Sequence, residues 1–335
     1  MNKRILAALL AIVLLLFALS SCEIPTFISN LLPQQTEEVT TPKPPDLPTP
    51  GEDSYFEAHF IDVGQADSAL IICDGQAMLI DAGNVADTDL VQDYLEEHNV
   101  THLNYVIGTH PHEDHIGGLK GVLRHTTADK IYCSAKTYST KAFRDFANYV
   151  GYNLKKELII PTPGESFLLG SARVTVLGPL RLDYEDVNDT SIVLRIEYGD
   201  LTFLFTGDME SVAERDLLDA ETNLKADVLK VGHHGSYSSS SYRFLREVAP
   251  TYAVISCGRN NDHGHPHESV LSRYRDADVK LYRTDLQGHI VCRTTDGKTL
   301  TFTTQMNPDA VTNPTAVQSD TSYLPTYLYY EEKFN

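Results

Sequence analysis

The chain has 335 residues, a hydrophobic content of 42% and a formal net charge of −19 at pH 7. This hydrophobic content is sufficient for one large domain, and neither end shows the apolar periodicity of a second one. The strong negative charge argues against a protein that functions mainly by binding duplex DNA, because such proteins concentrate Lys and Arg on one face. It does not exclude a nucleic-acid substrate, since basic residues can gather around a cleft.

The first 22 residues resemble a bacterial lipoprotein signal peptide. Lys3 and Arg4 precede an apolar run over residues 5–19, which is shorter than a stable membrane span. The run ends in Leu-Ser-Ser-Cys, which resembles the lipobox whose cysteine, here Cys22, is lipidated. We therefore expect an extracytoplasmic protein that is held at the cell membrane by acyl chains. The alternative is a secretory signal in which Cys22 is incidental.

The next segment, residues 23–53, is predicted to be a disordered linker. It lacks helical or strand periodicity and is rich in Pro and Thr, a composition that cannot bury a core. The folded domain is expected to occupy residues 54–304. A polar C-terminal tail over residues 305–335 follows, and its aromatic end is either disordered or packed on the domain.

Strand and helix patterns alternate along the predicted domain. Apolar or alternating runs predict the first strands over residues 56–62, 69–73, 77–81, 105–107 and 130–133. Apolar residues at helical spacing predict helices over residues 87–98 and 141–149, and a short helix from Ile116 to about His125. Three strands over residues 157–160, 165–169 and 172–177 are expected to begin a second sheet. A hairpin of residues 188–199 and 201–208 and strands over residues 227–231, 251–257, 279–283, 288–293 and 300–303 complete the domain.

Residues 109–118, which read Thr-His-Pro-His-Glu-Asp-His-Ile-Gly-Gly, follow one of these strands. Zinc, manganese and iron take imidazole and carboxylate groups as ligands, and four candidates of this kind are His110, His112, Asp114 and His115. Gly117 and Gly118 are expected to let the backbone turn tightly into a helix. A solvated histidine-rich loop is the alternative, but four such groups within six residues favour a metal site.

Further polar residues follow other predicted strands. Asp62, Asp81 and Asp208 come at strand ends, where α/β proteins commonly place their chemistry. The pair His233 and His234 follows the strand that ends at residue 231. We expect His233 to be the ligand of the two, because it lies nearer the strand end.

The metal loop resembles the His-x-His-x-Asp-His signature of the metallo-β-lactamase fold hydrolases. Within that fold the chain is similar to the soluble hydrolase domain of the ComEC competence proteins and to its stand-alone relatives. The resemblance covers residues 54–304 and implies an α/β fold with a four-layer αββα sandwich. It rests on Asp62-Val-Gly-Gln-Ala-Asp-Ser68, Leu79-Ile-Asp-Ala-Gly83, Thr206-Gly-Asp208, Val231-Gly-His-His-Gly-Ser236 and Gly264-His-Pro-His267, with Ala66 in place of the usual Gly.

This resemblance and the ligand chemistry together imply two divalent metal ions, zinc or manganese, and a metal-bound hydroxide as nucleophile. His110, His112 and His233 are assigned to one ion, and Asp114, His115 and His265 to the other. Asp208 is expected to bridge the two ions and, with Asp114, to act in catalysis. Residues expected to support the ligands are Asp62, Asp81, His234 and His267, the last as a cap of a helix near Glu268. Residues expected to contact substrate are Gln65, Asp67, Ser68, Asn188, Ser191, Lys230 and Ser236.

One ligand of the wider family is missing from this sequence. A His commonly lies just before the strand at residues 188–199, yet no His occurs between His125 and His233. Asn188, Asp189 and Ser191 lie in its place, and the ComEC-like group shares this departure. We interpret the sequence as a variant metal site. The remaining cysteines, Cys73, Cys133, Cys257 and Cys292, lie in predicted strands and are expected to be buried thiols.

These features predict a lipid-anchored, metal-dependent hydrolase. Phosphodiester bonds are the favoured substrate because the ComEC-like domain is linked with cleavage of a DNA strand during uptake, although the acidic charge does not favour nucleic acid as a partner. DNA transport by this chain alone is not expected, because it has no channel segments beyond the signal. The alternatives are a hydrolase of another ester, a nucleotide or a cell-envelope substrate, and a non-catalytic binding lipoprotein. β-Lactam hydrolysis is disfavoured by the missing His. The sequence does not predict an oligomeric state.

Overall fold

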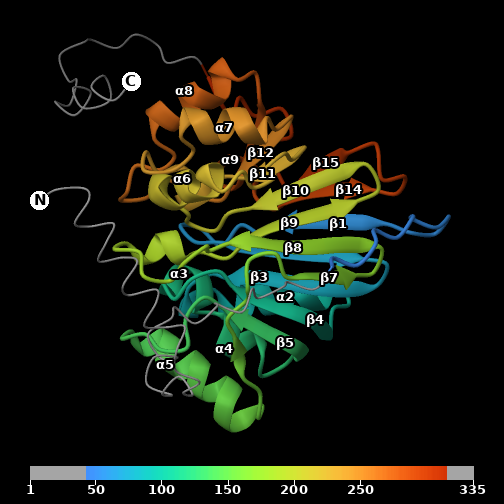
Figure 1. Ribbon diagram of the computed structural model, residues 1–335, viewed down its shortest axis with the longest axis vertical. Coiled ribbons are helices and arrows are strands. Elements are labelled where there is room, and N and C mark those ends of the chain that lie inside the picture. The colour runs from blue at the N-terminus through green and yellow to red at the C-terminus, as the bar shows by residue number, and fades with distance from the viewer. Residues whose placement is uncertain (1–42, 315–335) are drawn as a thin grey trace, which may run out of the picture. The chain divides into compact units, whose positions relative to one another are not determined.

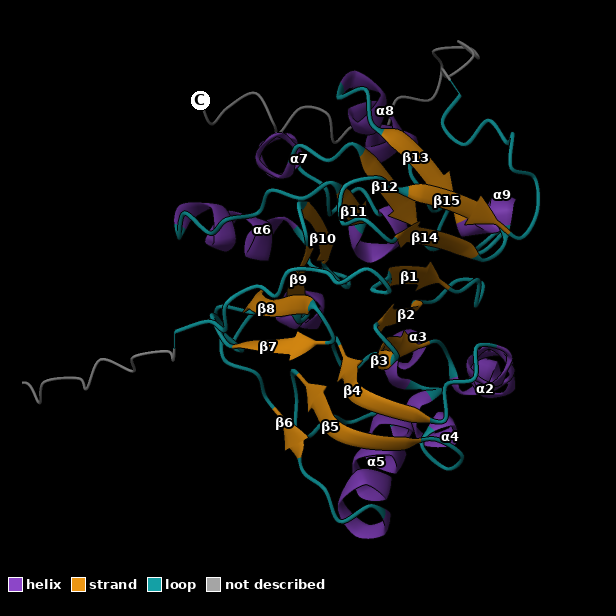
Figure 2. Cartoon of the chain, turned by 90° about the vertical axis from the view of Figure 1, so that its right-hand side faces the viewer, coloured by secondary structure: helices purple, strands orange, loops and turns teal. Residues whose placement is uncertain are grey.

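The computed structural model describes residues 43–314 of the chain. Within these residues two β-sheets pack face to face, and helices cover the outer side of each sheet (Figure 1). Figure 2 shows α6 and α7 on one side of the strands and α2 and α4 on the other. The predicted four-layer αββα sandwich is therefore confirmed.

The first sheet has eight strands in the order β15-β14-β1-β2-β3-β4-β5-β6. Strands β3 to β6 run parallel, and the other pairings are antiparallel. The two last strands of the domain thus return to lie beside its first. The bounds are β1 (Phe56–Phe60), β2 (Ser68–Cys73), β3 (Gln76–Ala82), β4 (His102–Gly108), β5 (Thr127–Cys133), β6 (Leu158–Ile159), β14 (Ile290–Thr294) and β15 (Thr301–Thr304).

The second sheet has seven strands in the order β13-β12-β11-β10-β9-β8-β7. Strands β10 to β13 run parallel, whereas β7 to β10 form an antiparallel meander. The bounds are β7 (Ser166–Leu169), β8 (Ala172–Gly178), β9 (Val193–Tyr198), β10 (Leu201–Phe205), β11 (Val228–Lys230), β12 (Tyr252–Ile255) and β13 (Lys280–Arg283).

Two strand predictions were wrong. Residues 157–160 do not begin the second sheet, because β6 pairs in parallel with β5 and ends the first one. Residues 188–190 are not extended but form a 3-10 turn, η3 (Val187–Thr190), whose start is capped by the side chain of Asp186 on the Asn188 amide. An Asp that bonds an amide two residues ahead stabilises such a turn, so β9 begins only at Val193.

The helices lie between the strands, mostly as crossovers of the parallel segments. Helices α6 and α9 were not predicted, and the metal loop is itself helical from Glu113 instead of beginning at Ile116. The bounds are η1 (Val85–Asp87), α2 (Thr88–Glu97), α3 (Glu113–Ile116), α4 (Leu119–Val122), α5 (Lys141–Asn148), η2 (Tyr149–Asn153), α6 (Ser211–Asp219), η4 (Gly232–Gly235), α7 (Tyr242–Val248), α8 (Glu268–Asp276) and α9 (Thr284–Gln287).

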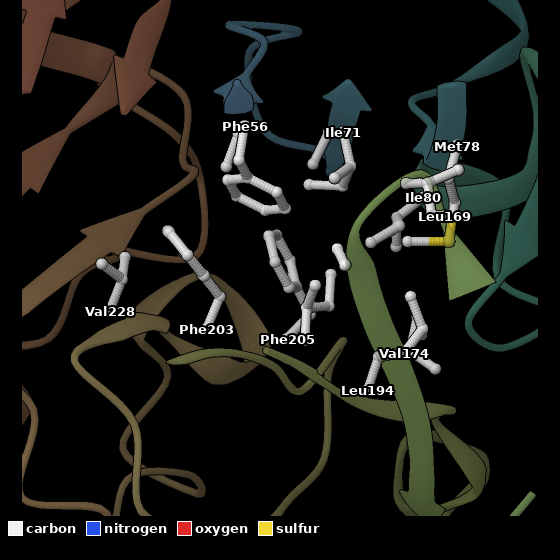
Figure 3. Close-up of a cluster of buried hydrophobic side chains, with 14 of the residues drawn as sticks. Phe56, Ile71, Met78, Ile80, Leu169, Val174, Leu194, Phe203, Phe205 and Val228 are labelled. Carbon is white, nitrogen blue, oxygen red and sulfur yellow. The ribbon is translucent and has the colours of Figure 1, made fainter. Parts of the chain in front are cut away.

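The main hydrophobic core fills the space between the two sheets. Figure 3 shows side chains of the first sheet, such as Phe56 and Ile71, facing Phe203 and Phe205 of the second. The rings of Phe56 and Phe203 lie 4.6 Å apart between centroids. Burial of each such side chain contributes about 1.5–3 kcal/mol. The core therefore holds the two sheets together as one frame for the strand ends described below.

Both ends of the described range contact the domain. Residues 43–53 contain no helix or strand, and the Pro45 carbonyl accepts a hydrogen bond from Arg173 at 3.1 Å. In the predicted tail, Thr312 donates to the Leu281 carbonyl at 2.6 Å. Cys22, the predicted signal, most of the linker and the aromatic end of the tail lie outside the described residues. Within residues 43–314, none of the helices combines the length and apolar character needed to cross a bilayer.

Candidate metal centre

The candidate centre lies where strand ends of the two sheets meet. In the first sheet, Asp81 is the penultimate residue of β3, and the metal loop follows β4. In the second, Asp208 follows β10, and His233 and His234 follow β11, which is parallel to β10. The Ile192 amide donates to the Thr109 carbonyl at 2.9 Å, which ties the two sheets together at this edge. The predicted gathering of strand-end residues therefore comes from the packing of the sheets.

Asp81 orients the metal loop. Its carboxylate accepts hydrogen bonds from the Thr109 amide at 2.8 Å and the Thr109 hydroxyl at 2.7 Å. Its Oδ2 also lies 2.8 Å from His115 Nδ1. His115 Nε2 consequently faces Asp208, at 3.2 Å from Oδ2. A carboxylate that holds the far nitrogen of an imidazole in this way is typical of metal-binding histidines.

The two glycines of the loop serve close packing. Gly117 and Gly118 have φ angles of −58° and −74°, so neither needs the left-handed region. A Cβ on Gly118 would lie 2.2 Å from the Ala82 carbonyl oxygen, and one on Gly117 would lie 2.5 Å from the Val85 nitrogen. The predicted role in a tight turn is wrong. These positions lack side chains because the loop packs directly on the backbone that follows β3.

Four side chains converge at the centre of the site. Asp114, His115, Asp208 and His234 each present an atom, and these atoms all lie within 4.8 Å of one another. His234 Nε2 is 3.4 Å from Asp114 Oδ2 and 3.5 Å from Asp208 Oδ2. We call these four residues the metal group.

The metal group fits a divalent cation. Within residues 43–314, three of its buried atoms find no hydrogen-bond partner: His115 Nε2, His234 Nε2 and Asp208 Oδ1. Buried polar atoms without partners are costly, so three of them in one place indicate a missing ligand. Two imidazole nitrogens and two carboxylates form a donor set that suits zinc or manganese.

The histidine pair after β11 has the opposite arrangement from the one predicted. His233 was expected to be the ligand, but His234 joins the metal group, and its Nδ1 is 3.0 Å from the Ser256 carbonyl. His233 Nδ1 instead lies 2.8 Å from Glu210, with its Nε2 3.8 Å from Asp208. Both histidines have left-handed φ angles, 47° and 51°. This bend of the backbone turns the second ring inward and leaves the first partly exposed.

His110 and His112 form a pair beside the metal group. His110 Nε2 lies 3.0 Å from His112 Nδ1, and the rings of His110 and His115 are 4.2 Å apart between centroids. His110 is fully buried, with Nδ1 3.4 Å from the Ser191 hydroxyl. The two rings are therefore placed where they could hold a second cation next to the first.

The charges of the centre depend on one another. Burial disfavours a charged imidazole at His115, but Asp208 and Asp81 outweigh it and raise the pKa of His115 well above its usual value. Against the same effect of burial, Asp208 and Asp67 raise the pKa of His234 to about 10. Burial and the charge of His115 lower the pKa of His110, so its ring is neutral, as a metal ligand requires. The carboxylates thus favour positive charge in the metal group. A bound divalent cation would supply this charge in place of the protons on His115 and His234.

Asp67 and Lys230, which were expected to contact substrate, form an ion pair with each other. Lys230 Nζ lies 2.7 Å from Asp67 Oδ2, and both side chains are buried behind the metal group. Burial opposes the charge of Asp67, but Lys230 and then His234 lower its pKa to about 2. Asp67 Oδ1 is also 3.3 Å from His234 Nδ1. The ion pair therefore supports His234 from behind.

Three serines expected at the substrate are also buried. The Ser68 hydroxyl donates to the Asp81 carbonyl at 3.2 Å, and Ser191 Oγ accepts from the Asp208 amide at 3.0 Å. The Ser236 hydroxyl lies 2.9 Å from that of Ser238. Through these contacts Ser68 and Ser191 hold the backbone of Asp81 and Asp208. Their role as substrate contacts is not supported.

The other predicted residues lie around the edge of the centre. Gln65 accepts from the Gly258 amide at 3.0 Å, and its Nε2 lies 3.2 Å from His265 Nδ1. His265 does not belong to the metal group, and its ring centroid is 6.2 Å from that of His234. Asn188 is buried and its Oδ1 has no partner, so it stays a candidate substrate contact.

Two supporting roles were predicted wrongly. His267 starts α8 but makes no side-chain cap, and its Nδ1 accepts from the Tyr237 amide at 3.1 Å. Asp62 does not approach a metal ligand. It accepts from the Gly64 amide at 3.2 Å, while its own amide donates to His289.

Sequence reasoning missed Glu210 as a site residue. Its carboxylate contacts His233 and accepts from the Ser238 hydroxyl at 2.7 Å. Its amide donates to the buried carboxylate of Asp189, which also accepts from the Ala213 amide and so holds the start of α6. The only available signal was an acid two residues beyond Asp208.

The comparisons with known proteins agree with this geometry. A model described as "Metallo-beta-lactamase superfamily" matches residues 61–259. The chain belongs to this superfamily. Superfamily members that are similar in sequence include ComE operon protein 3 of Bacillus subtilis, 29% identical over 72% of this chain and 33% of that protein. Competence protein ComA of Neisseria gonorrhoeae is 34% identical over 68% of this chain and 30% of that protein.

These superfamily relatives are ComEC-like competence proteins, so the predicted resemblance is confirmed. The chain spans about a third of the length of the relatives that it matches. Among solved structures, the metallo-beta-lactamase fold protein YhfI of Bacillus subtilis matches with a TM-score of 0.48 and 16% identity. That match covers 71% of this chain and all of YhfI.

Proposed function

We propose that this protein is a metal-dependent phosphodiester hydrolase that acts outside the cytoplasm. The observation that carries the proposal is the convergence of His115 Nε2, His234 Nε2 and Asp208 Oδ1, three buried atoms that lack partners. Membership of the metallo-beta-lactamase superfamily and the ComEC-like relatives support hydrolysis as the reaction class. The Cys22 motif supports attachment to the outer face of the membrane.

The proposal assigns the following roles to residues of the chain. Asp114, His115, Asp208 and His234 would hold one divalent ion, and His110 with His112 a second. Bound there, divalent ions activate water as a nucleophile at neutral pH and withdraw charge from the attacked ester. Asp81 and the Asp67–Lys230 pair keep the ligand rings of His115 and His234 in place.

His233 is positioned to act on the substrate. Its side chain is 22% exposed, whereas that of His234 is 2% exposed, so His233 lies on the open side of the metal group. Burial opposes its charge, but the hydrogen bond to Glu210 raises the pKa of His233. His233 Nε2 could therefore hold a proton near the leaving oxygen, a role for which the sequence had indicated no residue.

The test uses the full chain with bis-(p-nitrophenyl) phosphate and added zinc or manganese. We expect Asp208→Asn to lower turnover at least about a hundredfold, because loss of even a supporting partner of a ligand costs about 10–100-fold. The matched control is Asp183→Asn, which makes the same change at a side chain that is 86% exposed.

Unchanged turnover in folded Asp208→Asn would contradict the proposal. Metal binding without turnover of phosphodiesters or of simple esters would instead support the binding-lipoprotein alternative. Turnover of simple esters alone would keep the reaction class and change the substrate.

A further inference from the structure

Helix α5 and η2 form one helical segment with two different faces. Asn148 and Tyr149, at their junction, both have helical backbone angles. The buried face packs Phe143, Phe146 and Val150 into the core on the outer side of the first sheet. The exposed side chains follow one another at spacings of three or four residues, the last just beyond η2. We call them the basic stripe, and they are Lys141, Arg144, Asn148, Tyr152 and Lys155.

The charge around the basic stripe is opposite in sign to that of the whole chain. Residues 120–156 contain eight Lys or Arg side chains and two Asp, a net charge of +6 within a chain of net −19. Asp145 pairs with Lys120 and Lys141, yet Lys141 remains 82% exposed. Within residues 43–314, Arg144 and Lys155 form no ion pair with an acid. Their charges therefore remain available to an anionic partner.

Tyr152 adds an aromatic ring to these cations. Its side chain is 73% exposed, and it lies between Arg144 and Lys155 in the basic stripe. A tyrosine has an apolar ring and a polar hydroxyl, so it suits the boundary between lipid headgroups and acyl chains. Because the apolar face of this helical segment is already buried in the core, the segment cannot insert into a bilayer. It could instead lie on the headgroups, with only the Tyr152 ring reaching deeper.

The basic stripe is accessible and close to the metal loop. Figures 1 and 2 both place α5 at the end of the domain opposite α8, where a flat surface could approach it. Helix α5 packs against α3 of the metal loop. The ring of Tyr138, which precedes α5 in the chain, lies 6.0 Å from that of His112. A surface that contacts the stripe would therefore lie near the metal loop.

We propose that the basic stripe docks the domain on a membrane surface rich in anionic phospholipid and thereby holds the metal loop near the bilayer. This inference rests on the attachment to the membrane in the proposed function and does not depend on the reaction. An acyl anchor at Cys22 would keep the domain close to lipid, so a few weak contacts suffice for docking. Each basic side chain near an anionic surface contributes about fivefold in affinity.

A membrane fits the basic stripe better than a nucleic acid strand does. Strand binding stacks successive bases on several aromatic rings, whereas the stripe offers one ring, that of Tyr152, among three cations. The acidic remainder of the chain would be repelled by an anionic bilayer, which favours the orientation with the stripe facing the lipid.

The test is a charge reversal on the full chain, Arg144→Glu with Lys155→Glu. The matched control is Arg243→Glu with Arg246→Glu on α7, two exposed cations whose reversal changes the net charge by the same amount. Sedimentation gives the partition coefficient of each protein on vesicles of phosphatidylcholine alone and on vesicles that also contain phosphatidylglycerol. The ratio of the second coefficient to the first is the anionic preference. All proteins share one N-terminus, so its contribution to binding is common to them.

We expect the anionic preference of the Arg144/Lys155 variant to fall at least about tenfold, because two contacts with anionic headgroups are reversed. The control should change it less than about twofold, and added salt should lower the preference of the unmodified protein. Both variants should keep their turnover of bis-(p-nitrophenyl) phosphate in solution, which shows that they are folded. If the reversal does not fold, Arg144→Gln with Lys155→Gln replaces it and should show a smaller change in the same direction.

Equal losses of anionic preference in both variants, or no loss in the first, would overturn the proposal. It would also be overturned if the first variant kept its anionic preference and lost only affinity for fluorescent oligothymidylate, because the stripe would then bind nucleic acid.

Failure of the proposed function would look different. In that case the unmodified protein would prefer anionic vesicles through the basic stripe but would not turn over bis-(p-nitrophenyl) phosphate. Turnover without any anionic preference would overturn the docking proposal alone.

Discussion

The described residues contain two histidine clusters, and only one of them is built to hold a metal. The second lies where β1, α2 and the start of β14 meet. We call it the lateral cluster, and its members are Glu57, His59, Tyr94, His98 and His289. His59 Nδ1 is 2.9 Å from the Tyr94 hydroxyl, and Tyr94 stacks on His98 with 4.4 Å between centroids. It contains three imidazoles, one more than the metal group.

The two clusters differ in what their nitrogen atoms face. In the lateral cluster, His98 Nδ1 lies 2.8 Å from the Tyr94 carbonyl, His289 Nδ1 accepts from a backbone amide, and His59 Nε2 faces a single carboxylate at 3.4 Å. No group of three or more ligand atoms within 4.8 Å includes any of these residues in the described part of the chain. In the metal group, two imidazoles and two carboxylates converge. The number of histidines therefore does not indicate a metal site, whereas convergent atoms without partners do.

The largest expected effect concerns metal affinity. His115→Ala removes an imidazole whose Nε2 lacks a partner in the metal group, and we expect the affinity for zinc or manganese to fall at least about a hundredfold. His98→Ala makes the same change in the lateral cluster and should leave metal affinity unchanged. Isothermal titration calorimetry on the full chain measures both. Equal losses would mean that the lateral cluster also binds metal, and the contrast drawn above would be wrong.

The next effect concerns the buried ion pair behind the metal group. Lys230→Met leaves Asp67 buried without its ion-pair partner, which should lower the free energy of unfolding by about 3–5 kcal/mol. Lys141→Met breaks an exposed pair with Asp145 and should cost at most about 1 kcal/mol. Urea unfolding of both variants gives the difference. A loss below about 1 kcal/mol for Lys230→Met would show that the buried pair is not a support of the centre.

The smallest effect concerns the pH dependence of the lateral cluster. Burial lowers the pKa of His59 below its ordinary value of 6.5. The unfolded chain therefore takes up this proton first as the pH falls. Stability from the neutral ring is complete above pH 6.5 and is lost below it, by at most about 1.4 kcal/mol for each pH unit. His59→Asn should reduce the loss of stability between about pH 7.5 and about pH 5.5.

Urea unfolding at the two pH values measures this, with His102→Asn at a more exposed histidine on β4 as the control. An undiminished pH dependence in His59→Asn would show that His59 titrates in the folded protein as it does in the unfolded chain.

The sequence by itself determined the order of the strands and of the helices other than α6 and α9, and the residues of the metal loop. Period-two and period-3.6 patterns are local properties, and the chain needs no tertiary information to show them. The prediction that Asp81 and Asp208 approach the metal loop also followed from local information, because both end parallel strands. It succeeded for Asp81 because β3 and β4 are parallel neighbours whose carboxyl ends share one edge of a sheet. Asp208 belongs to the second sheet and reaches the loop through the packing of the two sheets.

Only the tertiary structure decided the choices between neighbouring residues. His233 and His234 are adjacent, and two left-handed backbone angles determine which ring faces the metal group. The sequence suggests that Lys230 is an exposed cation. The packing of the sheets instead places Asp67 2.7 Å from it. The sequence suggests that Gly118 is a turn residue. In the structure the Ala82 carbonyl leaves no room for a Cβ at this position. In each case the deciding contact joins segments far apart in the chain or depends on local backbone angles, and neither leaves a periodic signal in the sequence.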